Sequence, residues 1–332
     1  SFLPAAIGDI GAAVVGPTVK GPAMVPTVVE SYSEFQAIFG DSFKSGSQYY
    51  QYLTSHAAEN YLKHGAKLTV VRILDGGFAA ATASIANAAG NTSVELTTMT
   101  HGSPQNSSGL KTAHTGSNGI LTYGNKDNLR WEISNKNEEK GTFTLLIRRG
   151  SDTQTRKQVL ETWNNVSLDP NSNNYIEKVV GNQYITIKQG GTADPFLQFV
   201  GDYPNKSKYV RVNANLQTAD YLDENGNLRV NAQSASLPQV GSGSLNGGFG
   251  GGLNGVAGFD ALGNVLTSSG THHKPYDFYD AIGTNNSQGF PITAGDGDGK
   301  TAYLDALNLL SNADEYDINM LLVPGIIDNA GG

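Results

Sequence analysis

The apolar positions between residues 14 and 74 predict alternating strands and helices. An extended segment starts at Val14, and a short helix capped by Ser33 is expected to end at Gly40. A second helix is expected from about Gln48 to Lys63, because apolar residues recur there at steps of three and four. This predicted stripe consists of Tyr50, Leu53, Ala57 and Tyr61.

The next segment, Lys67–Leu74, has the pattern of a strand that is buried on both faces. Its apolar run is nearly continuous, as is typical of a strand in a mixed or parallel sheet covered by helices. Arg72 interrupts this run. A buried charge needs a partner, so we expect a structural ion pair there or a position at the edge of the sheet.

The pattern changes after residue 76 to short alternating segments separated by turn residues. Strands are expected within 93–99, 129–134, 141–149, 158–169, 183–189 and 207–214, and a short helix near Tyr175–Val180. The rest of 190–288 is rich in loops and includes a low-complexity glycine segment.

An α/β pattern returns near the end of the chain. A helix over 301–310, with Leu304, Leu307 and Leu310 as its apolar stripe, precedes a strand within 317–327. The predicted fold is therefore α+β and multidomain. A split α/β core domain (1–75 plus 293–332) would carry an inserted β-rich protruding region at 76–292, which could divide into subdomains at about 76–187 and 188–292.

Composition narrows the possible functions. The chain of 332 residues has 22 basic and 30 acidic residues, a net charge of −8, which disfavours direct binding to nucleic acid. Two basic pairs, Arg148–Arg149 and Arg156–Lys157, are interpreted as a solvated strand face. The chain has no cysteine, which excludes disulfides and thiolate metal sites. Its apolar runs are too short to predict membrane insertion.

Residues 294–301, Ala-Gly-Asp-Gly-Asp-Gly-Lys-Thr, are the sharpest enzymatic candidate. They resemble a phosphate-binding loop before a helix, in which Lys300 would contact phosphate and Thr301 would hold magnesium. However, Asp296 and Asp298 would repel the phosphates. A glycine and aspartate turn, with Asp298 or Thr301 capping the helix, is the preferred interpretation.

The same two aspartates, Asp296 and Asp298, also suggest a weak calcium site. A calcium loop needs a bidentate Glu at its twelfth position, and Asn308 lies near that position instead. The sequence also lacks the motifs of serine hydrolases and zinc proteases. It therefore predicts no enzymatic activity, no cofactor and no metal site.

Residues 14–40, VVGPTVKGPAMVPTVVESYSEFQAIFG, resemble the N-terminal region of contractile tail sheath proteins of bacteriophages and related injection systems. Residues 160–180, 292–307 and 318–326 resemble later parts of the same family. The matching positions are Gly21, Pro22, Pro26, Phe39, Gly40, Arg72, Gly295, Gly297, Pro324 and Gly325.

This resemblance implies a structural subunit that forms stacked rings in a helical array around a tail tube. Its partners would be copies of itself, the tail tube protein, and the baseplate and tail terminator proteins. It implies assembly in the host cytoplasm, a place in the virion tail, and contraction that drives the tube through the host envelope for genome ejection.

Sheath proteins usually have an arm at each end and a C-terminal domain, so the resemblance also implies that this chain is a fragment lacking them. Two alternatives stay open. One is a P-loop NTPase that uses Lys300 and Thr301, and the other is a secreted β-rich adhesin or carbohydrate-binding module.

Overall fold

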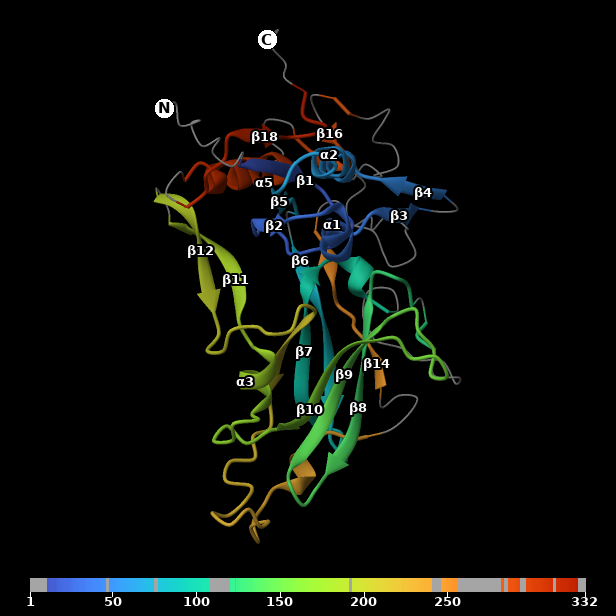
Figure 1. The fold of residues 1–332 in the computed structure, drawn as a ribbon, viewed down its shortest axis with the longest axis vertical. Helices are drawn as coiled ribbons and strands as arrows, with labels where there is room; N and C mark the ends of the chain where they lie inside the picture. The colour runs from blue at the N-terminus through green and yellow to red at the C-terminus, as the bar shows by residue number, and fades with distance from the viewer. Residues whose placement is uncertain are drawn as a thin grey trace, which may run out of the picture. The chain divides into compact units, whose positions relative to one another are not determined.

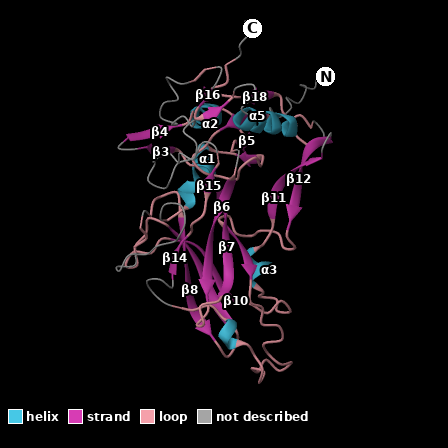
Figure 2. Cartoon of the chain, turned by 180° about the vertical axis from the view of Figure 1, so that it is seen from behind, coloured by secondary structure: helices cyan, strands magenta, loops and turns pink. Residues whose placement is uncertain are grey.

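The computed structural model describes residues 11–45, 48–74, 77–107, 120–122, 124–190, 193–240, 246–255, 282–283, 286–292, 297–312 and 315–327. The chain divides into two compact units: unit 1 comprises 1–76, 187–197 and 269–332, and unit 2 comprises 77–186 and 198–268 (Figure 1). Strands predominate over helices (Figure 2), which agrees with the mixed α and β class predicted from the sequence.

Unit 1 contains a four-stranded sheet built from both ends of the described chain. Its order is β18 (Met320–Leu322), β1 (Ala12–Gly16), β5 (Leu68–Arg72) and β2 (Thr27–Val29). β1 is parallel to both of its neighbours, whereas β2 is antiparallel to β5. The apolar segments predicted near residues 70 and 320 therefore belong to one sheet, as the sequence indicated.

The first helix, α1 (Tyr32–Phe39), begins two residues earlier than the predicted cap at Ser33 implies. Ser31 caps it, since its Oγ accepts a hydrogen bond of 3.2 Å from the backbone N–H of Glu34. The Glu34 carboxylate in turn accepts the N–H of Glu30 at 2.9 Å. This reciprocal pairing satisfies exposed backbone donors at the helix start and fixes its boundary.

The second predicted helix is wrong over its first residues. Gln48–Gln51 forms strand β4, antiparallel to β3 (Ser42–Ser45), and helix α2 covers only Leu53–Leu62. Aromatic side chains favour strands, and the ring of Phe43 in β3 stacks on Tyr52 with centroids 4.7 Å apart. α2 buries Thr54, Ser55 and Ala58, while Ala57 and Tyr61 of the predicted stripe are partly buried and pack against the same core.

The last helix, α5 (Gly297–Leu310), packs on β1 and on β17 (Phe290–Pro291), which pairs with β16 (Asn286–Ser287). Its buried side chains are Ala302, Tyr303, Ala306, Leu309 and Leu310. The predicted stripe is thus partly wrong: Leu304 is exposed, Leu307 is half-buried, and only Leu310 is buried. Small alanines let the helix lie close to the sheet, which leucine spacing did not reveal.

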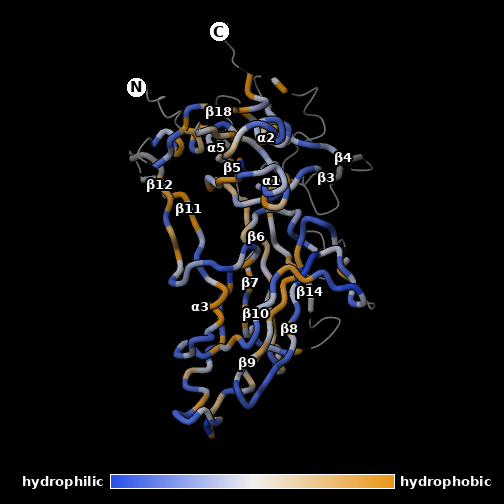
Figure 3. Tube along the Cα trace, viewed as in Figure 1, coloured by the Kyte–Doolittle hydropathy of each residue, from blue (hydrophilic) through white to orange (hydrophobic). Residues whose placement is uncertain are grey.

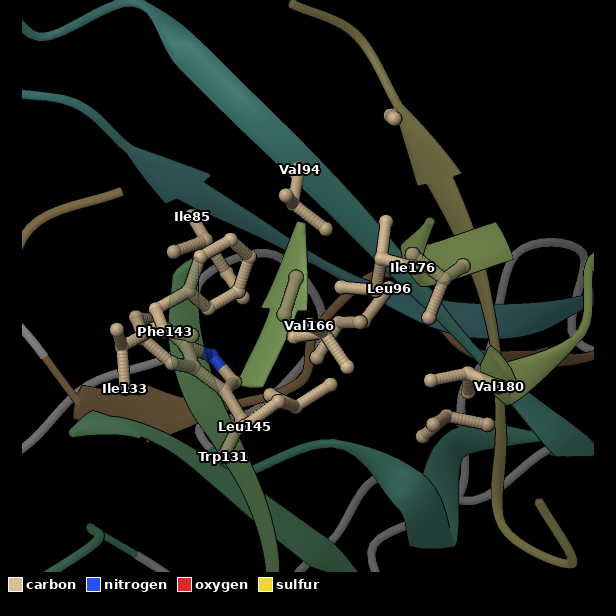
Figure 4. Packing of buried hydrophobic residues seen from close by; sticks show 14 of the residues in the cluster. Ile85, Val94, Leu96, Trp131, Ile133, Phe143, Leu145, Val166, Ile176 and Val180 are labelled. Carbon is tan, nitrogen blue, oxygen red and sulfur yellow. The ribbon is translucent and has the colours of Figure 1, made fainter. Parts of the chain in front are cut away.

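Unit 2 packs two antiparallel sheets around one core (Figure 4). The first has the order β10 (Val159–Ser167), β9 (Thr142–Arg149), β8 (Leu129–Asn137) and β14 (Asn246–Gly248). The second has the order β13 (Val210–Ala214), β7 (Thr92–His101), β6 (Phe78–Ala86) and β15 (Leu253–Asn254). Inward positions of both sheets, with α3 (Ile176–Val180), form the core, and hydrophobic residues mark α3 and β7 in Figure 3.

The remaining described elements lie outside the three four-stranded sheets. β11 (Tyr184–Gly190) and β12 (Ala193–Val200) form a separate two-stranded sheet. Single 3-10 turns cover Ser103–Gln105 and Ser234–Ser236. Each segment predicted as a strand between residues 93 and 214 contains one. In the segments that belong to the two packed sheets of unit 2, one face of the strand meets the buried core.

The solvated strand face predicted for the basic pairs is wrong for Arg148. Its side chain is fully buried and forms a two-pronged contact with Asp152, at 2.8 Å from Nε to Oδ2 and 2.9 Å from Nη2 to Oδ1. Glu132 accepts from the same guanidinium at 2.7 Å and from Lys157 at 2.7 Å. Arg149 and Arg156 are exposed, as expected.

Candidate functional site

Four of the residues that carry the family resemblance, Gly21, Phe39, Gly40 and Arg72, meet at the end of β5. The Arg72 side chain is 1% exposed and donates from Nη1 to the Gly21 carbonyl at 2.7 Å and from Nη2 to the Val19 carbonyl at 3.5 Å. Backbone carbonyls, rather than the expected carboxylate, accept these two bonds. The Arg72 carbonyl also accepts the N–H of Met24 at 2.8 Å. Arg72 thus fastens the loop between β1 and β2 to the sheet.

Burial lowers the pKa of Arg72 to about 10, and the neighbouring Tyr52 phenol acts in the opposite direction. The guanidinium therefore remains charged at neutral pH. Burial also raises the pKa of Tyr52, which keeps its phenol protonated. Two backbone carbonyls of the loop accept from the charged Arg72 side chain, so the loop conformation and the charge depend on each other.

Gly21 is required at this junction for two reasons. Its φ of +116° is unfavourable for residues with a side chain, and a Cβ there would lie 2.5 Å from Cδ1 of Phe39. Phe39 is fully buried, and its carbonyl accepts the Lys20 N–H at 3.0 Å. The loop and the end of α1 are therefore in direct contact through backbone and ring.

Gly40 ends α1 with a φ of +76°, and its N–H donates to the Gln36 carbonyl at 3.0 Å. A Cβ at Gly40 would lie 2.9 Å from Cβ of Val19. Gly21, Phe39, Gly40 and Arg72 consequently form one network, which we call the Arg72 junction. Pro22 and Pro26 lie half-buried in the adjoining loop.

Replacing Gly21 with alanine is expected to destabilise unit 1 by about 2–4 kcal/mol, from backbone strain and overpacking against Phe39. Hydrogen exchange of peptides covering α1 and β5 measures this loss. Gly283→Ala is the matched control, because a Cβ there meets nothing within 4 Å. Protection of Gly21→Ala equal to that of the control would contradict the prediction.

Pro324 and Gly325 lie in a second network, after β18. The Gln288 side chain donates to the Pro324 carbonyl at 2.9 Å, and the Ser287 hydroxyl donates to the Gly325 carbonyl at 2.7 Å. Gln288 also accepts the N–H of Leu53, the first residue of α2, at 2.9 Å. One buried glutamine thus joins the start of α2 to the segment after β18. Sequence reasoning missed Gln288, because a polar residue before glycine is typical of any loop.

The residues considered for phosphate or calcium binding lie only partly within the described part of the chain. Gly295 and Asp296 lie outside the described residues, and Gly297 and Asp298 belong to the first turn of α5. Lys300 and Thr301 are exposed on that helix. Among the described residues, no group of three or more His, Asp or Glu side chains is placed to bind a metal ion. None of their helices combines the length and hydropathy needed to cross a bilayer.

The sheet of unit 1 has two edges. β2 and β18 are its outer strands, and within the described residues no further strand pairs with either. Val28 on β2 is exposed, as are Met320 and Leu321 on β18. An outer strand offers backbone donors and acceptors to another strand, so both edges are suited to strand addition.

Comparison with known proteins finds similarity among solved structures. The chain is similar to a sheath tail protein of Desulfitobacterium hafniense, with 11% identity over 99% of this chain and 45% of that one, at a TM-score of 0.37. It is also similar to a sheath tail protein of Listeria innocua, with 12% identity over 94% of this chain and 48% of that one, at a TM-score of 0.36. The chain spans just under half the length of each. No protein-family model and no curated protein matches it.

Proposed function

We propose that this chain is part of a structural subunit of a contractile tail sheath. The observation that carries the proposal is the Arg72 junction, in which the separate residues of the sequence resemblance, Gly21, Phe39, Gly40 and Arg72, make one network beside an open sheet. Each has a structural role there, as expected if the family pattern encodes a scaffold.

In this proposal, copies of the subunit form stacked rings in a helical array around the tail tube. A head-to-tail contact that does not close on itself generates such a lattice. The two open sheet edges would receive strands from neighbouring subunits. Contraction would be a change between two packings of nearly rigid subunits, with its energy stored at assembly, so that no nucleotide or cofactor is needed.

The proposed partners are other copies of the subunit, the tail tube protein, and the baseplate and terminator proteins, within the virion tail after assembly in the host cytoplasm. The α/β core domain proposed for 1–75 and 293–332 would make the lattice contacts. The inserted region at 76–292, proposed to have two parts, would tolerate variation because its loops would not build the lattice.

The test of this function is electron microscopy of the full-length gene product, alone and with its tail tube protein. We expect striated tubes with a helical repeat. A product that stays monodisperse at high concentration and fails to coat tubes would contradict the proposal.

Strand addition at β18 has a sharper test. The N–H of Met320 donates to the Gly11 carbonyl at 3.1 Å, so alternation along a parallel strand directs the N–H of Leu321 away from β1. Leu321→Pro removes this outward donor and should abolish tubes in the full-length product while β1 stays protected from hydrogen exchange. Leu321→Thr keeps the donor and should still assemble. Tubes formed equally well by the proline variant would refute strand addition at this edge.

A further inference from the structure

A solvent-open pocket of about 570 Å³ lies within unit 2. Its walls come from the turn between β8 and β9, the last residues of β10, the loop from β10 to α3, and the loop after β13. The volume falls within the range of small-molecule pockets. Its lining, however, is mostly amide, hydroxyl and carboxylate groups, with Leu222 as a partly buried apolar patch.

The pocket holds polar groups that are not committed to the fold. Within the described part of the chain, the side chains of Lys140, Asn165 and Asn174 make no hydrogen bond or ion pair, and all three are exposed. Each amide offers both donors and an acceptor. The free groups can therefore donate to and accept from the same ligand.

Unusual backbone conformations orient two of the polar side chains that line the pocket. Asn165 has a φ of +54° and lies where the pairing of β10 with β9 shifts register between Trp163 and Val166. Such a bulge turns a side chain out of the strand pattern and is common beside binding sites. Asp220 also has a positive φ, +55°, and Asn171 donates to its carboxylate at 3.2 Å, which links the two loops across the pocket.

Charge and geometry select the class of ligand. One lysine faces two carboxylates, Asp169 and Asp220, so an anion such as phosphate would be repelled. Asp169 already accepts the backbone N–H groups of Asn171 and Tyr221, at 2.9 and 3.2 Å, and among the described residues no third acidic or histidine side chain joins the two aspartates to hold a divalent cation. A neutral ligand with many hydroxyls matches a lining of mixed donors and acceptors.

We propose that this pocket binds a neutral oligosaccharide. Vicinal hydroxyls would bond to the carboxylate of Asp220 and the amides of Asn165 and Asn174, and a sugar face would rest on Leu222. A free oligosaccharide and the end of a surface polysaccharide share this chemistry. The proposal rests on the pocket residues of unit 2 and does not use the sheet edges of unit 1.

The test uses the whole chain and defined probes: maltotriose, cellotriose and triacetylchitotriose, together with starch, cellulose and chitin. Saturation-transfer NMR detects binding of the soluble trisaccharides, and sedimentation of the protein with each polymer detects binding to the polymers. We expect at least one sugar to bind, and binding to a polymer alone would assign the pocket to surface polysaccharide. Binding to none of the six, or binding of calcium chloride alone, would overturn the proposal.

Two variants locate the binding. Asn165→Gly removes an amide but suits the left-handed backbone, and Asp220→Asn removes a charge without changing shape. Each should weaken binding about tenfold, the loss of one good hydrogen bond. The matched control is Asn135→Gly, an exposed residue of the same unit with a φ of +50° that does not line the pocket. Equal affinity of all three for the sugar would overturn the site.

Discussion

Replacing Asp152 with alanine is expected to destabilise unit 2 by about 3–5 kcal/mol, the usual cost of leaving buried charges without their counter-ion. Arg130 and Arg148 lie directly opposite each other on β8 and β9, and both are fully buried. Like charges in this position repel each other. Asp152 contacts both, at 3.3 Å to Arg130 and 2.8 Å to Arg148, and so offsets this repulsion.

The pKa of Arg130 supports this account. Burial lowers the pKa of Arg130 most, and the charge of Arg148 lowers it further, whereas Asp152 raises it. Glu132 cannot replace Asp152 for both arginines, since it is already shared between Arg148 and Lys157. The Asp152 carboxylate also accepts the backbone N–H of Gln158 at 2.9 Å, so its loss frees the loop that covers the arginines.

Tryptophan fluorescence during urea unfolding measures this effect in unit 2 alone. The chain has two tryptophans, and both lie in this unit: Trp131 in β8 and Trp163 in β10. Glu139→Gln, a change at an exposed position of the same unit, should shift the free energy of unfolding by less than about 0.5 kcal/mol.

A second substitution tests the proposed cause. In an Asp152→Asn background, Arg130→Met removes one of the two facing charges and should recover part of the lost stability. Additive losses from the two changes would show that repulsion between the arginines is not the cause. An Asp152→Ala midpoint equal to that of Glu139→Gln would refute the larger prediction.

This network also shows where sequence reasoning reaches its limit. Alternation in 141–149 identified β9 correctly, because Phe143, Leu145 and Ile147 fill one face of a core strand. The other face of such a strand is usually solvated, and Arg148 was assigned to it. The chain after Arg149 instead folds back and supplies Asp152. Asp152 lies only four residues after Arg148 in the sequence. Whether the chain folds back to bring the two side chains together depends on tertiary contacts, which the local sequence pattern does not encode.

In unit 1, the central strands were more predictable from the sequence than the side-chain hydrogen bonds that connect distant segments. Continuous apolar runs predict that β5 and β18 are strands. Each run is typical of a strand in a sheet covered by helices, so one shared sheet was expected, and both strands do pair with β1. The Gln48–Gln51 strand was missed because Tyr50 continues the helical spacing of Leu53, Ala57 and Tyr61. Gln288 was missed because its bonds reach residues more than 30 positions away, to Leu53 and Pro324, and no local pattern encodes them.

Replacing Arg72 with alanine is expected to destabilise unit 1 by about 3–5 kcal/mol, through a buried cavity and unsatisfied backbone carbonyls. The carbonyls of Val19 and Gly21 would lose their donor in a site that water does not reach. Arg72→Lys should recover only part of the loss, because an ammonium lacks the planar fork that reaches both carbonyls. Arg72→Met fills most of the volume but has no hydrogen-bond donor. Comparing it with Arg72→Ala therefore distinguishes the cost of the cavity from the cost of the lost hydrogen bonds.

Hydrogen exchange of peptides from β1, β5 and the intervening loop measures this effect, because the tryptophans report only on unit 2. Lys63→Ala is the control in the same unit: Lys63 is exposed and pairs with Glu59 at 3.1 Å, a surface contact that contributes about 0–1 kcal/mol. Faster exchange confined to unit 1, with unchanged tryptophan fluorescence, is the expected outcome. Protection in Arg72→Met equal to that of the parent chain would mean that packing alone, without the guanidinium, holds the Arg72 junction together.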